Sequence, residues 1–119
     1  MAGEPTLDAA ALDRLTEWGG AELREKMIEL FSRNAPERLN GVRDGLAAGD
    51  LELAHRSAHS LKSTSANVGA EALGALAGRI EALLDGGNSS EAGALVAELE
   101  QLMGETLTAL AAARNPEGA

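Results

Sequence analysis

Apolar residues recur every three or four positions along most of this 119-residue chain, and short glycine-containing segments separate the stretches. That spacing is typical of helices that bury one face, whereas no stretch shows the period-two alternation of a half-buried strand. Aromatic residues make up only 2% of the chain, so aliphatic residues must build the core. Such a composition favours helices over strands. The sequence therefore predicts an all-α protein.

The breaks in the pattern divide the chain into one short and four longer helices. The predicted helices span about 7–18, 21–49, 51–66, 70–84 and 89–114. Pro36 lies inside the second, which we interpret as one helix with a bend, two separate helices being the alternative. Thr6 is expected to cap the first helix, Asp50 the third, and Ser89 or Ser90 the last.

Short connections between long helices predict an antiparallel four-helix bundle with the short N-terminal helix packed on one end. The length suits a single domain over residues 1–119, with a core over about 7–114 and flexible tails at 1–6 and 115–119. Three further apolar positions are expected to join the buried stripes: Trp18, Leu30 and Leu51.

Composition argues against several classes of function. The formal net charge is -9, which disfavours binding to nucleic acid or to an anionic membrane. The chain has no cysteine, no apolar run near the length of a membrane span and no secretory signal pattern. We therefore expect a cytoplasmic protein.

The residues best suited to chemistry lie in the third predicted helix. On a helical projection His59 falls roughly 130° from the centre of the apolar face, so it should be exposed. An exposed neutral imidazole is a nucleophile near pH 7. Lys62 and His55 lie on the same side, and Lys62 can offset the charge of a phosphoryl group. Ser63 and Ala66 are small enough to let a partner approach.

The fourth predicted helix should pack beside His59, because the two helices form a hairpin about the turn at 67–69. His59 is then expected opposite residues 78–82, where Glu81 can accept a hydrogen bond from one ring nitrogen and fix the tautomer. Gly74 and Gly78 share a stripe with Glu81. They either leave this side of the hairpin open or let the helices pack closely.

The stretch from His59 to Ala70, HSLKSTSANVGA, resembles the signature of histidine phosphotransfer (HPt) domains, which pass phosphoryl groups between receiver domains in phosphorelays. Similarity extends over about residues 7–110. The resemblance implies that His59 accepts the phosphoryl group, with Lys62 as the nearby cation and Glu81 holding the ring. It implies that Ser65 and Gly69 support the hairpin. Ser63 departs from the glycine usual in the family.

The resemblance also implies a carrier that exchanges the phosphoryl group with an aspartate of a receiver domain in a response regulator or hybrid kinase. The chain shows no ATP-binding motif, so no kinase activity and no cofactor of its own are expected; the receiver would bring Mg²⁺. We expect a monomer. The partner surface is predicted to include His55, Arg56, Ala66, Gly78 and Arg79, the two arginines adding positive field near His59.

Two other functions stay open. The same bundle could act as an adaptor that binds and sequesters a receiver or kinase without being phosphorylated. His55 and His59 are also four residues apart, a spacing that can bind zinc on a helix, but no third ligand is evident from the sequence, and no metal is expected.

Overall fold

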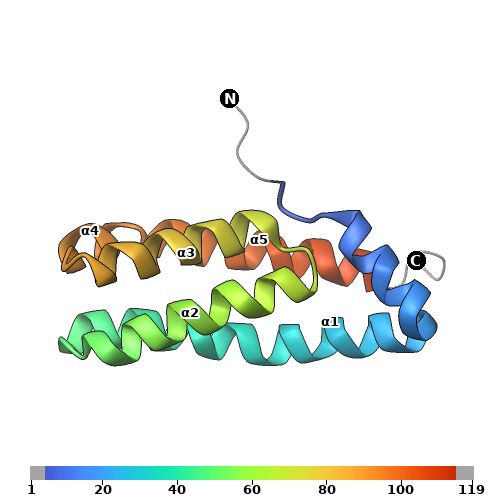
Figure 1. Ribbon diagram of the computed structural model, residues 1–119, viewed down its shortest axis with the longest axis horizontal. Helices are drawn as coiled ribbons and strands as arrows, with labels where there is room; N and C mark the ends of the chain where they lie inside the picture. Colours follow the sequence, from blue (N-terminus) through green and yellow to red (C-terminus); the bar gives the residue numbers. More distant parts are fainter. Residues whose placement is uncertain (1–4, 115–119) are drawn as a thin grey trace.

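The computed structural model describes residues 5–114, and within that range every regular element is a helix (Figure 1). The elements are α1 (Ala9–Ala48), α2 (Leu51–Asn67), α3 (Glu71–Asp85), α4 (Ser89–Ala94) and α5 (Val96–Arg114). The all-α prediction is therefore confirmed. No helix in the described range is both long enough and apolar enough to cross a membrane.

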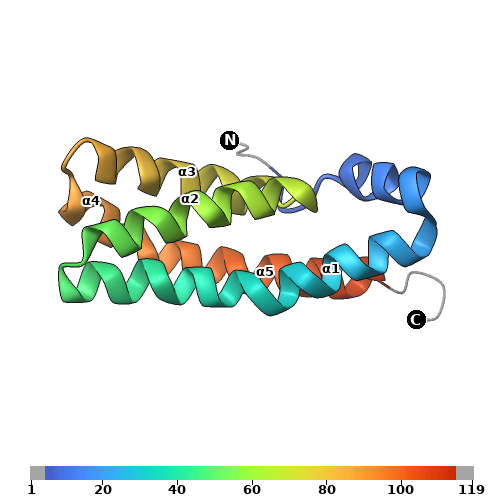
Figure 2. The same cartoon turned by 60° about the horizontal axis from the view of Figure 1, so that its bottom comes forward.

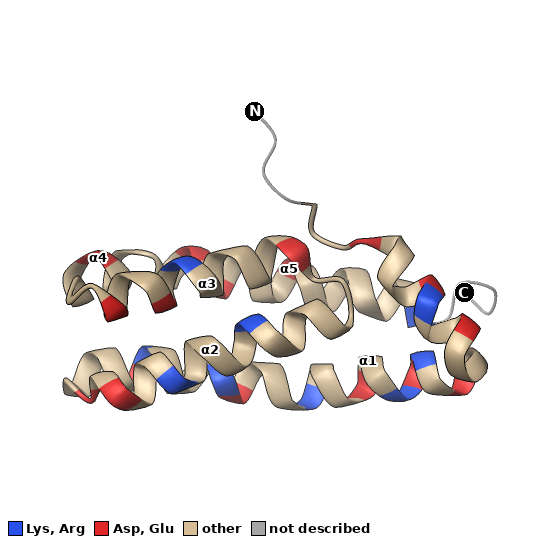
Figure 3. Cartoon of the chain, in the orientation of Figure 1, with Lys and Arg blue, Asp and Glu red and all other residues tan. Residues whose placement is uncertain are grey.

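Four long helical segments form an antiparallel bundle: the main part of α1 together with α2, α3 and α5 (Figures 1 and 2). α1 packs against α2 and α5, and α3 packs against the same two helices. The described chain is elongated, with principal extents of 45 × 30 × 22 Å. Acidic and basic residues are interspersed along α1, α2 and α3 (Figure 3).

Gly20 separates the short N-terminal helix from the long one. Its backbone has φ 76° and ψ −173°, outside the helical region, so α1 is two helices joined at a kink. We call the first of them, residues 9–19, the N-terminal arm; in Figure 2 it lies beside one end of the bundle. Beyond the kink, the backbone stays helical through Pro36 to Ala48, so one helix rather than two spans this region, as predicted.

The arm is attached to the turn between α2 and α3. Asp8 N–H donates to the Gly69 carbonyl at 2.7 Å, and Ala72 N–H donates to the Pro5 carbonyl at 2.9 Å. The prediction of a tail over 1–6 is therefore wrong for Pro5 and Thr6, while residues 1–4 and 115–119 lie outside the described range. Thr6 is not the cap: Asp8 is, its carboxylate accepting from Ala10 N–H.

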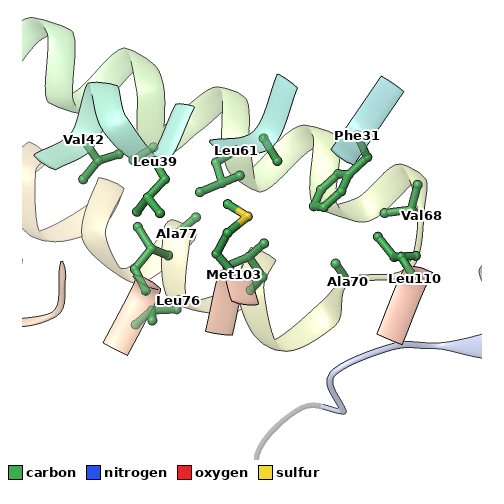
Figure 4. Packing of buried hydrophobic residues seen from close by; sticks show 14 of the residues in the cluster. Phe31, Leu39, Val42, Leu61, Val68, Ala70, Leu76, Ala77, Met103 and Leu110 are labelled. Atoms are coloured by element: carbon green, nitrogen blue, oxygen red, sulfur yellow. The ribbon is translucent and has the colours of Figure 1, made fainter. Parts of the chain in front are cut away.

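The core is aliphatic and runs along the axis of the bundle (Figure 4). Its largest fully buried side chains are Leu12, Ile28, Leu61, Leu73, Ile80, Leu99 and Leu110. Phe31 is also buried. Three residues assigned to the buried stripes were predicted wrongly: Trp18 is 73% exposed, Leu51 41% and Leu30 36%. The apolar periodicity of a helix can continue past the end of its neighbour. An apolar residue at such a position has no side chains to pack against and stays exposed.

The last predicted helix is divided at Leu95 into α4 and α5. Leu95 N–H donates to the Ala92 carbonyl three residues back, which marks a tightened turn, and the neighbouring Gly93 has a low helix propensity. The cap was also predicted wrongly. Asn88 occupies the cap position, without a side-chain hydrogen bond, and Ser89 begins the helix.

Candidate functional site

The hairpin of α2 and α3 builds the site, and its two ends are well defined. Asp50 caps α2 as predicted, with its carboxylate accepting from Leu53 N–H. Gly69 has φ 75° in the turn, and a Cβ there would lie 2.6 Å from the Asp8 carbonyl oxygen. Because the left-handed backbone and the arm both exclude a side chain, only glycine fits this turn.

Ser65 supports the hairpin because its small side chain lets α3 pack closely and its backbone carbonyl accepts a hydrogen bond from the turn. The residue is fully buried, and its carbonyl accepts from Ala70 N–H at 2.9 Å. Its hydroxyl has no hydrogen-bond partner among residues 5–114, so within that range the bond expected of this side chain is not formed. A Cβ at Gly74 would lie 3.2 Å from that of Ser65. Here the glycine lets the two helices pack closely.

His59 and Glu81 meet across the hairpin. His59 Nδ1 lies 2.7 Å from Glu81 Oε2, and the side chains are 59% and 12% exposed. A carboxylate only accepts hydrogen bonds, so Nδ1 carries the proton and donates. In the neutral ring, Nε2 then holds the free lone pair. The contact expected from the hairpin register is thus present, and it fixes the tautomer.

Lys62 binds the other oxygen of the same carboxylate. Its Nζ lies 3.0 Å from Glu81 Oε1, and its side chain is 47% exposed. A Cβ at Gly78 would lie 3.1 Å from Lys62 Cδ. Gly78 therefore makes room for the lysine stem to cross α3.

Two opposing effects set the pKa of Glu81. Burial of the carboxylate raises it, but hydrogen bonds and charges from Lys62 and His59 together outweigh burial, so the pKa lies below its ordinary value of 4.5. Glu81 is therefore ionised at neutral pH, and its carboxylate can accept hydrogen bonds from the His59 imidazole and the Lys62 ammonium at the same time.

His55 is more enclosed than a solvated helix residue. Its side chain is 37% exposed, and Nε2 lies 2.8 Å from Asp85 Oδ1 and 3.8 Å from Glu81 Oε2. The short approach to Asp85 has the distance of an ion pair but not the alignment of a hydrogen bond, and in the described part of the chain Nε2 has no hydrogen-bond partner. Asp85 was not among the predicted site residues, although its place four residues after Glu81 puts it on the same face of α3.

Two depressions lie along the hairpin, one at His59 and one beside Lys62. One is lined by Glu52, His55, Arg56, His59 and Glu81. The other, about 400 Å³, lies where the arm meets the hairpin and is lined by Asp8, Ala11, Arg14, Lys62, Ala66, Gly69, Ala70, Glu71, Gly74 and Ala75. The contribution of the arm to this second depression was missed, because periodicity does not say where a short helix docks.

The remaining predicted site residues are exposed. Ser63, Ala66, Arg56 and Arg79 all lie on the surface of the hairpin. Within residues 5–114 neither arginine forms an ion pair, so their charges remain available to a partner, and Arg56 lines the first depression. The Ser63 hydroxyl forms no hydrogen bond in this range.

Comparisons with known proteins agree with this geometry. The family model described as Hpt domain matches residues 26–113. Among solved structures, the chain is similar to histidine-containing phosphotransfer protein B (HptB) from Pseudomonas aeruginosa PAO1, with 26% identity and a TM-score of 0.88, over 96% of this chain and 98% of that one. No curated protein matches the sequence. The family match covers well over half of the sequence, and the chain therefore belongs to the Hpt domain family.

Proposed function

We propose that this protein is a phosphorelay carrier in which His59 exchanges a phosphoryl group with an aspartate of a receiver domain. The observation that carries the proposal is the 2.7 Å contact between His59 Nδ1 and Glu81 Oε2 beside an exposed ring. It leaves Nε2 as the nucleophile and holds the imidazole in one orientation. Transfer of this kind depends mainly on positioning and electrostatics, which a rigid helix can supply.

In the acceptance step, the Nε2 lone pair attacks the phosphorus of an aspartyl phosphate. A P–N bond forms, the P–O bond to the aspartate breaks, and the aspartate leaves as a carboxylate. The proton stays on Nδ1, so the ring gains a formal positive charge. The ionised Glu81 carboxylate, already bound to Nδ1, offsets that charge. The reverse step returns the phosphoryl group with the same bonds exchanged.

Lys62 is proposed to stabilise the phosphoryl oxygens. Its ammonium is half exposed and is held near the imidazole by Glu81. A flexible stem lets it reach an arriving phosphoryl group, where a charge-assisted hydrogen bond is stronger than a neutral one. The Mg²⁺ that offsets charge during transfer is proposed to be bound by the receiver.

We propose that the receiver docks over both depressions and the small residues between them. Ala66 on α2 and Ala75 on α3, both exposed, give this surface apolar contacts, while Arg56 and Lys62 give it local positive charge. These local cations would attract an acidic receiver site, although the net charge of the whole chain is negative. We further propose a monomeric, cytoplasmic carrier, in line with one acceptor site per chain.

The test is phosphoryl transfer from phosphorylated receiver domains to the wild type, His59→Gln and His55→Gln. The chain has two histidines, so the second variant is a matched control. Acid-labile, alkali-stable phosphate on the wild type and His55→Gln, and none on His59→Gln, would establish the carrier. Receiver binding without transfer from any receiver would overturn it and favour the sequestering adaptor.

A further inference from the structure

His55, Glu81 and Asp85 form a cluster beside His59 that the transfer step does not use as a whole. Each residue offers one ligand atom, and the three atoms lie within 4.8 Å of one another. Glu81 and Asp85 are one turn apart on α3, and His55 faces them from α2. The three donors therefore come from two packed helices rather than from a single mobile segment.

The separations suit a small ion. Two donors bound to a tetrahedral zinc at about 2.0–2.1 Å are roughly 3.3 Å apart. His55 Nε2 lies 2.8 Å from Asp85 Oδ1 and 3.8 Å from Glu81 Oε2, so the observed separations bracket that spacing. Shifts of about half an ångström would bring these two separations to that spacing. Imidazole nitrogen and carboxylate oxygen are both ligand types that zinc accepts, and the imidazole favours a transition metal over Mg²⁺ or Ca²⁺.

The state of His55 provides an independent indication. Its Nε2 atom is shielded from solvent, yet it has no hydrogen-bond partner among the described residues. Its approaches to Asp85 and Glu81 have ion-pair distances, which pair the nitrogen only in the protonated ring, so a shielded neutral nitrogen here would need a ligand. It sits between two carboxylates, so a cation placed there would satisfy the nitrogen and the carboxylates together. Ligation through Nε2 would require that nitrogen to be unprotonated.

We propose that His55, Glu81 and Asp85 bind a divalent transition-metal ion of the zinc class, with the remaining coordination position taken by water. Glu81 and Asp85, which the sequence did not reveal as ligands, both lie on α3, and His59 is not a ligand. Glu81 Oε2 is 2.7 Å from His59 and 3.8 Å from His55, so ion and imidazole would compete for one oxygen. Binding of the ion would then release His59 and slow phosphoryl acceptance, a consequence that rests on the proposed function.

Calorimetric titration of the full chain with Zn²⁺ tests the site directly. The wild type should bind one ion, and His55→Gln and Asp85→Asn should each weaken binding by more than about tenfold. His59→Gln removes the competing imidazole and should bind the ion at least as tightly as the wild type. Asp13→Asn changes an exposed aspartate on the arm and should bind as the wild type does. Circular dichroism of every variant would check that the helices remain.

Absence of saturable binding to the wild type would overturn the proposal. So would loss of binding in His59→Gln with binding kept in Asp85→Asn, which would indicate the pair of histidines on α2 instead. In the transfer assay, Zn²⁺ should slow acceptance by the wild type but not by Asp85→Asn. If no receiver phosphorylates the chain even with a chelator present, the proposed carrier function is wrong. Calorimetry would still show whether the metal site exists.

Discussion

Glu81 on α3 reaches across the hairpin to His59 on α2, with 2.7 Å between Oε2 and Nδ1, although the two residues are 22 positions apart in the chain. The carboxylate is nearly buried, whereas the imidazole is exposed. A fixed acceptor thus holds a ring that a partner can reach. This arrangement separates two tasks, since Nδ1 is used for orientation and Nε2 is left for chemistry.

Glu81→Gln should slow phosphoryl acceptance by up to about a hundredfold, because the amide orients the ring less firmly and carries no charge to offset that of the phosphorylated ring. Nitrogen NMR of the His59 ring should show a mixture of tautomers in place of one. Glu91→Gln, an exposed glutamate on α4, serves as the control and should change neither quantity. An unchanged tautomer in Glu81→Gln would contradict the positioning role.

Lys62→Ala should slow acceptance by about tenfold, the effect of losing one hydrogen bond to a charged group. Lys62→Arg should retain most of the rate, because it keeps the charge. The side chain is half exposed, so stability should change by less than about 1 kcal/mol in either variant. Stopped-flow transfer rates and urea unfolding measure the two effects. A large loss of stability without a change in rate would assign Lys62 a structural role only.

Gly41→Ala should destabilise the bundle by about 1–3 kcal/mol. α1 approaches α2 so closely here that an added Cβ would collide with Ser57 Oγ and lie 2.9 Å from Ser57 Cβ. Gly104→Ala on α5 is the matched control. Its Cβ would meet nothing within 4 Å, so the gain in helix propensity should leave stability equal or raise it by up to about 1 kcal/mol. Equal effects of both substitutions in urea unfolding would refute this account of the packing.

The stability that Glu81 provides should depend on pH in a defined direction. Its pKa in the folded protein is lowered from 4.5 by Lys62 and His59 despite burial, so folding favours the ionised form. The contribution of Glu81 to the free energy of unfolding is therefore present above about pH 4.5, and it is lost as the pH falls through the pKa of the folded state. With a chelator present, Glu81→Gln should lose less stability than the wild type over that acidic range. An equal loss in urea unfolding would show that the contacts of Glu81 do not favour its ionised form.

The sequence predicted the hairpin well because its signals are local. Asp50 and Gly69 mark the beginning of α2 and the turn after it, and two helices joined by a short turn have little freedom of register. Glu81 could therefore be placed opposite His59 by counting from the turn. The helical projection of α2 predicted that His59 is exposed, since the apolar face of this helix is unambiguous.

Features that depend on packing between distant segments were not predicted. Periodicity assigned Trp18 to the core, but the bundle does not extend to it. Asp85 was overlooked, because a helical face shows which residues align and not which side chain turns toward His55. The docking of the arm through Asp8 depends on a backbone bond to Gly69, which leaves no pattern in the sequence.

The central claim is that Glu81 directs phosphorylation to one nitrogen of His59. Nitrogen and phosphorus NMR of the phosphorylated protein, labelled in histidine, tests it most directly. The account predicts a single P–N bond at Nε2 of His59, with the proton retained on Nδ1. A phosphoryl group on Nδ1, or on His55, would contradict it.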